Sequence, residues 1–171
     1  FKSVRPYSKL RILGGSALPV SGFSFATRLA DRQMTDLINQ VLGSVDETLC
    51  RAILARWTHG LEGSIAQQHI DLLHSEREWI KANPVVTLAS QQFPLYTFRN
   101  IEGDWEGLNI DILARITRMT GLQFAHIETF STMQTLDLLK GGIAQMNSTL
   151  SISQERKAFL NFSYSYGGAP W

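Results

Sequence analysis

The segment from Asn147 to Arg156 brings hydroxyl, amide and guanidinium groups together in ten consecutive residues, Asn-Ser-Thr-Leu-Ser-Ile-Ser-Gln-Glu-Arg. Ser and Thr hydroxyls and unpaired backbone N–H groups can converge on an oxyanion, and a guanidinium can bind the same anion through two hydrogen bonds. This combination favours the binding of a small anion, with Arg156 as the clamp.

An ordinary structural role explains the same residues. Ser153 is a suitable N-cap, and a helical arginine such as Arg156 is usually solvated. The motif alone leaves both interpretations open.

The neighbouring residues place this segment in the fold. Ile143 and the alternation around Met146 predict a strand after a Gly141-Gly142 turn, and a helix is predicted from Gln154 to Leu160. The polar residues would then form a loop at the carboxyl end of a strand.

Strands and helices alternate through the rest of residues 85–160. Strands are predicted at 85–88 and 122–127, and helices at 109–120 and from the Ser131 capping box to Gly141, with Met133, Leu136 and Leu139 facing inward. The pattern predicts an α/β fold with a largely parallel sheet flanked by helices. Ligands on such sheets lie beyond the carboxyl ends of the strands, which here carry residues 91–98 and 147–153.

The N-terminal part predicts a strand and a helical hairpin. Residues 22–28 alternate like a half-buried strand, a helix follows from Arg32 to Gly43, and a second runs from about 47 to 57. Cys50 in the second helix is interpreted as a buried structural thiol. A short helix is expected from Glu76 to about Ala82, with Trp79 packing it onto the following unit.

Composition narrows the classes of function. The chain has 171 residues, a net charge of +1 and 44% apolar residues, which is typical of a globular domain. There is no basic stripe that would favour nucleic acid, and no apolar run long enough to span a bilayer. The four histidines show no ligand spacing, so neither a metal nor a cofactor is expected.

Three aromatic residues, Phe93, Tyr96 and Phe98, surround a proline-containing turn. They could line a ligand pocket, because loops at strand ends carry recognition, or they could plug the core of the lobe. The sequence favours the second role for Tyr96 and Phe98.

An ordered set of motifs in residues 85–171 resembles the first lobe of the periplasmic solute-binding proteins of family 3, the amino-acid-binding Venus flytraps. The motifs, in order, are Val85-Val86-Thr87-Leu88, Phe93-Pro94-Leu95-Tyr96, Gly107-Leu108-Asn109-Ile110-Asp111, Ser151-Ile152-Ser153-Gln154-Glu155-Arg156 and Asn161-Phe162-Ser163. The chain departs from the family at four places, with Leu95 for a proline and Asn109, Ala144 and Asn161 for aspartates.

The resemblance implies a ligand site. By analogy, Arg156 would hold a ligand carboxylate with Ser151, Thr149 and Ser148, and Phe93 would stack on the ligand. It implies no catalytic residue, no metal and no cofactor.

A second resemblance concerns the N-terminal part. The strand, the helices and the Arg56-Trp57 pair are similar to the end of a family 3 domain, and residues 73–84 are similar to the segment that opens each flytrap in BvgS/EvgS-type hybrid sensor histidine kinases. The expected organisation is the tail of a first flytrap domain at 1–58, a connector at 59–84 and the incomplete first lobe of a second domain at 85–171, all part of a longer protein.

The expected function is therefore the sensing of a small solute, an amino acid or small anion, in the periplasmic region of an inner-membrane kinase. Its expected partners are that ligand, a second lobe and a neighbouring flytrap domain, with a homodimer also considered and nucleic acid excluded. One alternative is a substrate-binding protein of an amino-acid ABC transporter. Another is an enzyme on a flytrap fold, which would need a cleft acid or base that the sequence does not offer.

Overall fold

The computed structural model describes residues 22–44 and 70–166. Several sequence predictions lie outside these residues, namely those for the helix around Cys50, for Arg56-Trp57 and for the first part of the connector. The described elements are β1 (Phe23–Arg28), the 3-10 helix η1 (Leu29–Asp31), α1 (Arg32–Gly43), α3 (His74–Ala82), β2 (Val85–Gln91), β3 (Phe98–Arg99), β4 (Trp105–Glu106), α4 (Leu108–Thr120), β5 (Gln123–Thr129), α5 (Thr132–Lys140), β6 (Met146–Ser151), α6 (Gln154–Lys157) and β7 (Leu160–Phe162).

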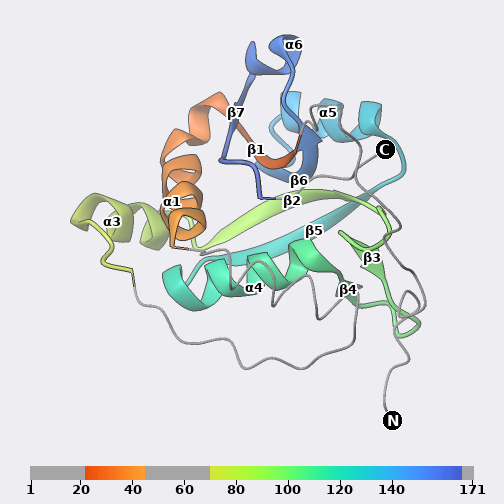
Figure 1. Ribbon diagram of the computed structural model, residues 1–171. Coiled ribbons are helices and arrows are strands. Elements are labelled where there is room, and N and C mark those ends of the chain that lie inside the picture. The colour runs from red at the N-terminus through yellow and green to blue at the C-terminus, as the bar shows by residue number, and fades with distance from the viewer. Residues whose placement is uncertain (1–21, 45–69, 167–171) are drawn as a thin grey trace, which may run out of the picture.

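A five-stranded sheet of order β5-β2-β6-β1-β7 forms the centre of the fold (Figure 1). Strand β2 is parallel to β5 and β6, whereas β1 is antiparallel to both β6 and β7. Four strands therefore run in one direction and only β1 opposes them, which confirms the expected α/β fold with a largely parallel sheet.

Strand β1 lies inside the sheet although its residues are far in sequence from those of its neighbours. The alternation of residues 22–28 predicted a half-buried strand, but Phe23 to Thr27 are all buried. The sequence pattern misleads here because β1 has a strand on each side and helices on both faces, so polar Ser24 and Thr27 are buried too.

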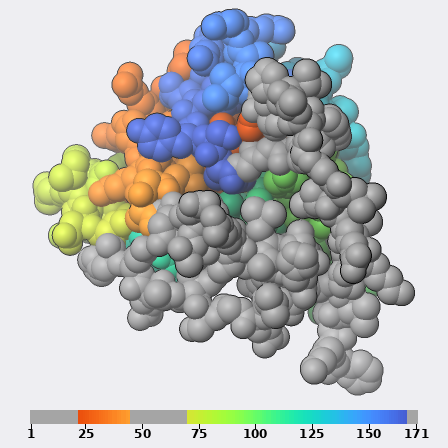
Figure 2. Space-filling view, in the orientation of Figure 1, coloured from red at the N-terminus to blue at the C-terminus, as the bar shows by residue number. Residues whose placement is uncertain are grey.

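Helices cover the two faces of the sheet. On one face, α1 packs against β1 and β7 and α4 against β5, and their apolar side chains share one core with those of β2 and Met146 of β6. The partly buried Trp79 and Ile80 of α3 join that core, as expected for Trp79. Figure 2 shows α1 and α3 side by side on one flank. On the other face, Leu139 of α5 packs with residues of β1, β2 and β6.

Helix α1 is joined to the core by one apolar face. Its buried apolar side chains are Met34, Leu37, Ile38, Val41 and Leu42, which are the residues that the sequence placed on that face. Burying a side chain of this size contributes about 1.5–3 kcal/mol, so the face contributes on the order of 10 kcal/mol before the cost of ordering the chain. Residues 22–44 are thus a structural part of this lobe.

Local predictions were correct for most helix ends. Ser131 caps α5, its hydroxyl accepting from the N–H of Gln134, and Gly121 ends α4 in the left-handed conformation. Helix α3 begins earlier than predicted, since Glu76 accepts from the N–H of Leu73 and moves the cap from Ser75 to Leu73. Met133 was expected to face inward but is 74% exposed.

The C-terminal part differs more from the prediction. The helix predicted from Gln154 to Leu160 ends at Lys157, and Leu160 begins β7. Residues 147–151, predicted as a loop, belong to strand β6. Both differences have one cause: β1 pairs with β6 and β7, and this long-range pairing extends the strands beyond what local pattern indicates.

Candidate functional site

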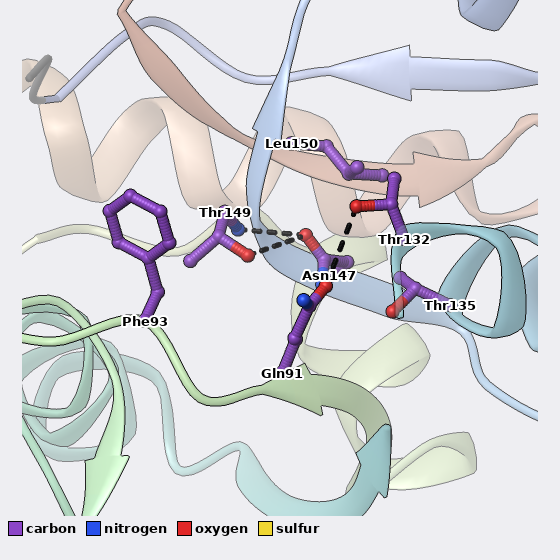
Figure 3. A pocket seen from close by; sticks show the side chains of 7 residues that line it. All are labelled: Gln91, Phe93, Thr132, Thr135, Asn147, Thr149 and Leu150. Carbon is purple, nitrogen blue, oxygen red and sulfur yellow. Dashed lines mark hydrogen bonds between the residues drawn. The ribbon is translucent and has the colours of Figure 1, made fainter. Parts of the chain in front are cut away.

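A cavity of about 150 Å³ lies at the carboxyl ends of β2 and β6, beside the first turn of α5 (Figure 3). Its lining consists of Gln91, Phe93, Thr132, Thr135, Asn147, Thr149 and Leu150. This is where open α/β sheets bind their ligands. The lining side chains are hydroxyls, amides and apolar groups without formal charge, so they can orient a small polar ligand by hydrogen bonds.

An irregularity in β6 shapes the cavity. The pairing of β1 with β6 shifts by one residue between Ser24 and Ala26, as in a β-bulge. The Asn147 amide donates to the carbonyl oxygen of Ala89 at 2.8 Å, and its Oδ1 accepts from the backbone N–H of Thr149 at 2.7 Å. Asn147 thereby ties β6 to β2 and fixes the bulge next to the cavity.

The opposite wall comes from β2 and α5. The hydroxyl of Thr132 lies 3.5 Å from Oε1 of Gln91. Thr135, one turn further along α5, shares a buried hydrogen bond of 2.8 Å with Thr129 of β5. These contacts hold the start of α5 against the ends of β2 and β5.

Phe93 follows the carboxyl end of β2 and lines the cavity, and other aromatic rings pack against its ring. Its centroid is 5.6 Å from that of Tyr96 and 5.4 Å from that of Phe23 in β1. Tyr96 also packs edge-on against Phe23, and Phe98 is buried in the core. The sequence expectation that Tyr96 and Phe98 pack into the lobe therefore agrees with their positions.

Leu95 and Gly107 give the turn after Phe93 its shape. Leu95 adopts φ +71°, a value that proline cannot reach. Gly107 precedes α4 at φ +128°, and a Cβ atom there would lie 2.4 Å from the carbonyl oxygen of Tyr96. The turn and the start of α4 can approach this closely only because residue 107 has no side chain.

Two of the five residues assigned to ligand binding, Thr149 and Phe93, line the cavity. Arg156 lies outside the lining, and one of its terminal nitrogens donates to the carbonyl oxygen and the hydroxyl of Ser151, at 2.8 and 3.0 Å. The ordinary capping role of Ser153 is also present, since its hydroxyl accepts from the N–H of Arg156.

Ser148 points away from the cavity. It is 1% exposed, and both its hydroxyl and its carbonyl oxygen accept from the amide of Asn109 on α4. Its side chain therefore lies on the α4 side of the sheet.

Sequence reasoning did not assign Gln91, Thr132, Thr135 or Asn147 to the site. Gln91 and Asn147 were within the predicted strand ends, and Thr132 follows the Ser131 cap, so position in the fold was the available signal. No residue type marked them, because neutral amides and hydroxyls are common on any surface.

A second polar cluster lies at the β5 edge of the sheet. Trp105 of β4 stacks on His126 of β5 with centroids 5.2 Å apart, and the Arg99 guanidinium lies 4.5 Å from the centre of the Trp105 ring. Arg99 also pairs with Glu128 at 3.2 Å, and His126 Nδ1 lies 2.8 Å from the Ser90 hydroxyl. Burial and the positive charge of Arg99 lower the pKa of His126. The stack fastens the β3–β4 hairpin to the sheet.

Within residues 22–44 and 70–166, no group of three or more His, Cys, Asp or Glu side chains could hold a metal ion. No helix in those same ranges is both long and apolar enough to cross a membrane.

Curated relatives match nearly the whole chain. The Virulence sensor protein BvgS of Bordetella pertussis is 25% identical over 161 residues, and that of Bordetella bronchiseptica is 26% identical over 163. Each match covers 94% of this chain but 13% of the relative, so the chain spans about an eighth of these proteins.

Two solved structures are similar. The crystal structure of the Bordetella pertussis BvgS periplasmic VFT2 domain is 25% identical with a TM-score of 0.48, covering 53% of this chain and 39% of that one. The BvgS periplasmic domain of the same organism is 21% identical with a TM-score of 0.52, covering 70% and 24%. The second likeness supports the fold.

The lobe itself matches a known protein family. The bacterial extracellular solute-binding proteins, family 3, match residues 85–170, which run from the start of β2 past the end of β7. The segment is accordingly a ligand-binding domain and not a catalytic one. The chain belongs to the bacterial extracellular solute-binding proteins, family 3.

Proposed function

We propose that this chain is part of the periplasmic ligand-sensing region of a hybrid sensor histidine kinase, and that its cavity binds a small solute with a carboxylate or similar anionic group. The main support is the cavity at the strand ends, in the place where a solute-binding lobe takes its ligand. The BvgS proteins, which match 94% of the chain, are named as virulence sensors, and this favours a sensor over a transporter component.

Arg156 would supply the positive charge that the cavity lining lacks. One of its terminal nitrogens is occupied by Ser151, while its Nε and its other terminal nitrogen have no acceptor among the described residues. A guanidinium fixed in this way at one nitrogen can still bind a carboxylate through the others. Ser151 would orient the guanidinium, and Thr149 and Gln91 would add neutral hydrogen bonds.

Signalling would follow from the differential affinity of the ligand for two states. A solute that contacts this lobe and a second lobe together binds the closed arrangement better, and so shifts the population toward it. We further propose that residues 1–58 are the tail of a preceding flytrap domain and residues 59–84 the connector. Because β1 of that tail pairs with β6 and β7 of this lobe, closure would be passed between the neighbouring domains.

An NMR titration of the ¹⁵N-labelled chain tests the site. Acetate and glycine, added at millimolar concentration, should shift the amide resonances of Thr149 and Ser151, whereas neutral acetamide should not. Arg156→Ala should weaken acetate binding about tenfold or more, because a hydrogen bond to a charged group contributes about 1.5–3 kcal/mol.

Lys157→Ala is the matched control, since Lys157 is the next cation on α6 and is exposed. It should leave acetate binding unchanged. If Arg156→Ala binds acetate as well as the unchanged chain does, the assignment of Arg156 is wrong.

The kinase context needs a separate test on the whole periplasmic region of the parent protein. Calorimetry against amino acids and small carboxylates should show binding that Arg156→Ala weakens. A parent reading frame that ends after a second lobe, without a membrane span or kinase domain, would favour the alternative of an ABC transporter substrate-binding protein.

A further inference from the structure

Asn109, at the start of α4, is completely buried and connects two segments that flank the cavity. Its Nδ2 donates to the Thr97 hydroxyl at 3.0 Å, to the Ser148 carbonyl oxygen at 3.2 Å and to the Ser148 hydroxyl at 3.3 Å. The two hydrogens of the amide are thus shared among three acceptors. Its backbone N–H also donates to the carbonyl oxygen of Tyr96 at 2.9 Å.

Both acceptor residues are next to cavity-lining residues. Thr97 closes the turn that carries Phe93: the Phe93 N–H donates to the Thr97 carbonyl oxygen at 2.6 Å, and the Thr97 N–H donates to that of Phe93 at 2.9 Å. Ser148 directly precedes Thr149, within the bulge of β6. A shift of Asn109 would therefore be transmitted to Phe93 on one side and to Thr149 on the other.

The Ser148 carbonyl oxygen has a second donor in the Tyr166 hydroxyl. The Tyr166 ring stacks on Phe25 of β1 at 4.5 Å, and burial keeps the pKa of Tyr166 well above its ordinary value, so the hydroxyl stays a donor at neutral pH. Two side chains from distant parts of the chain hold one backbone carbonyl of the bulge.

An amide donor suits this position better than a carboxylate. A carboxylate at residue 109 would be acceptor-only when ionised and would place its charge against the Ser148 carbonyl oxygen. The Thr97 and Ser148 hydroxyls could turn to donate to the carboxylate, but its charge would still be buried beside the Ser148 carbonyl oxygen, which is costly.

We propose that Asn109 is a positioning residue that sets the relation between Phe93 and Thr149 across the cavity mouth. The meaning of this role for binding rests on the proposed solute site, but the positioning itself is a property of the unliganded lobe. It can therefore be tested without any ligand.

The test compares Asn109→Asp with Asn161→Asp in the ¹⁵N-labelled full chain. Asn161 is a matched control, because its side-chain amide also bonds the backbone, donating to the carbonyl oxygens of Arg28 and Leu29 at 3.1 and 3.3 Å. At pH 7, Asn109→Asp should shift the amide resonances of both Phe93 and Thr149. Asn161→Asp should shift resonances around Arg28 and leave Phe93 and Thr149 unchanged.

Acidification provides a signature that general destabilisation would not give. The carboxyl group of Asn109→Asp, once protonated, regains a donor for the Ser148 carbonyl oxygen, so the Phe93 and Thr149 resonances should return toward their original positions as pH falls. No such return is expected for the unchanged chain. Unchanged Phe93 and Thr149 resonances in Asn109→Asp at pH 7 would overturn the proposal.

A second variant decides the question if Asn109→Asp does not fold. Thr97→Val removes one acceptor of the Asn109 amide without burying a charge, and it should shift the resonances of Phe93 and Thr149 in the same directions by a smaller amount. A Thr97→Val chain whose Thr149 resonance stays fixed would contradict the proposal. A lobe that passes these tests but does not bind acetate would refute the solute site while leaving the positioning role intact.

Discussion

The ring of Phe23 packs edge-on against the ring of Phe93, with 5.4 Å between the ring centroids and 74° between the ring planes. Phe93 lines the cavity, whereas Phe23 belongs to β1 and lies outside the family match at residues 85–170. The wall of the candidate site therefore depends on a residue from the upstream segment.

Replacing Phe23 should destabilise the lobe and loosen that wall. Phe23 is buried, and buried Phe→Ala changes cost about 3–5 kcal/mol. We expect Phe23→Ala to lower the free energy of unfolding, measured with denaturant, by about 3 kcal/mol. Phe130→Ala serves as control: Phe130 is 80% exposed, so its loss should change stability by no more than about 0.5 kcal/mol. Equal effects of the two changes would contradict this view of β1.

Gly107→Ala should be strongly destabilising. The added Cβ would lie 2.4 Å from the Tyr96 carbonyl oxygen and 2.6 Å from its carbon, and both are backbone atoms that cannot rotate away. We expect a loss of at least about 2 kcal/mol of unfolding free energy, as for other overpacking changes.

Gly43→Ala is the control, because it makes the same substitution at another position and should raise the free energy of unfolding instead of lowering it. Gly43 lies in α1 and has no atom within 4 Å of an added Cβ. Because Gly43 is the last residue of α1, the helix propensity of alanine should stabilise the chain by up to about 0.5 kcal/mol, less than in a helix interior. Denaturant midpoints of the two variants should fall on opposite sides of that of the unchanged chain.

Leu95→Pro should disrupt the turn that holds Phe93. Proline fixes φ near −65°, whereas Leu95 has φ +71°. The change should therefore cost about 3 kcal/mol and displace the Phe93 ring from the cavity. Leu95→Gly, which tolerates positive φ, should stay within about 1 kcal/mol of the unchanged chain. A thermal melt of Leu95→Pro that matches that of the unchanged chain would show that this turn is not constrained.

The stack of His126, Trp105 and Arg99 should make stability depend on pH. Burial and the charge of Arg99 lower the pKa of His126 in the folded chain below its usual value of 6.5. Between the pKa of the folded state and 6.5, the unfolded chain binds more protons than the folded chain, so the free energy of unfolding rises with pH. The stability that neutral His126 contributes is fully present above pH 6.5, and it is lost as the pH falls through the pKa of His126 in the folded chain.

Two variants check that interpretation. His126→Gln should reduce the dependence of unfolding free energy on pH between 7 and 5. Arg99→Gln should raise the pKa of His126, followed by NMR of the imidazole, because it removes the neighbouring positive charge. A pKa of His126 at or above 6.5 in the unchanged chain would contradict the role given to its burial.

Local pattern was enough to determine most of the helices and the class of the fold. The apolar face of α1, the Ser131 cap and the Gly121 stop depend on residues within a few positions of each other, so their physics can be read along the chain. The ordered motifs from Val85 to Ser163 likewise predicted the family, which residues 85–170 confirm.

The tertiary structure alone decided where β1 lies and how the cavity is built. Phe23 to Arg28 pair with β6 and β7, whose residues are more than a hundred positions away, and this pairing turns a predicted loop into the bulged strand that presents Thr149. The packing of α5 against β2 likewise brings the neutral residues Gln91 and Thr132 together in one wall. Such contacts are set by packing between distant segments, for which the sequence carries no periodic signal.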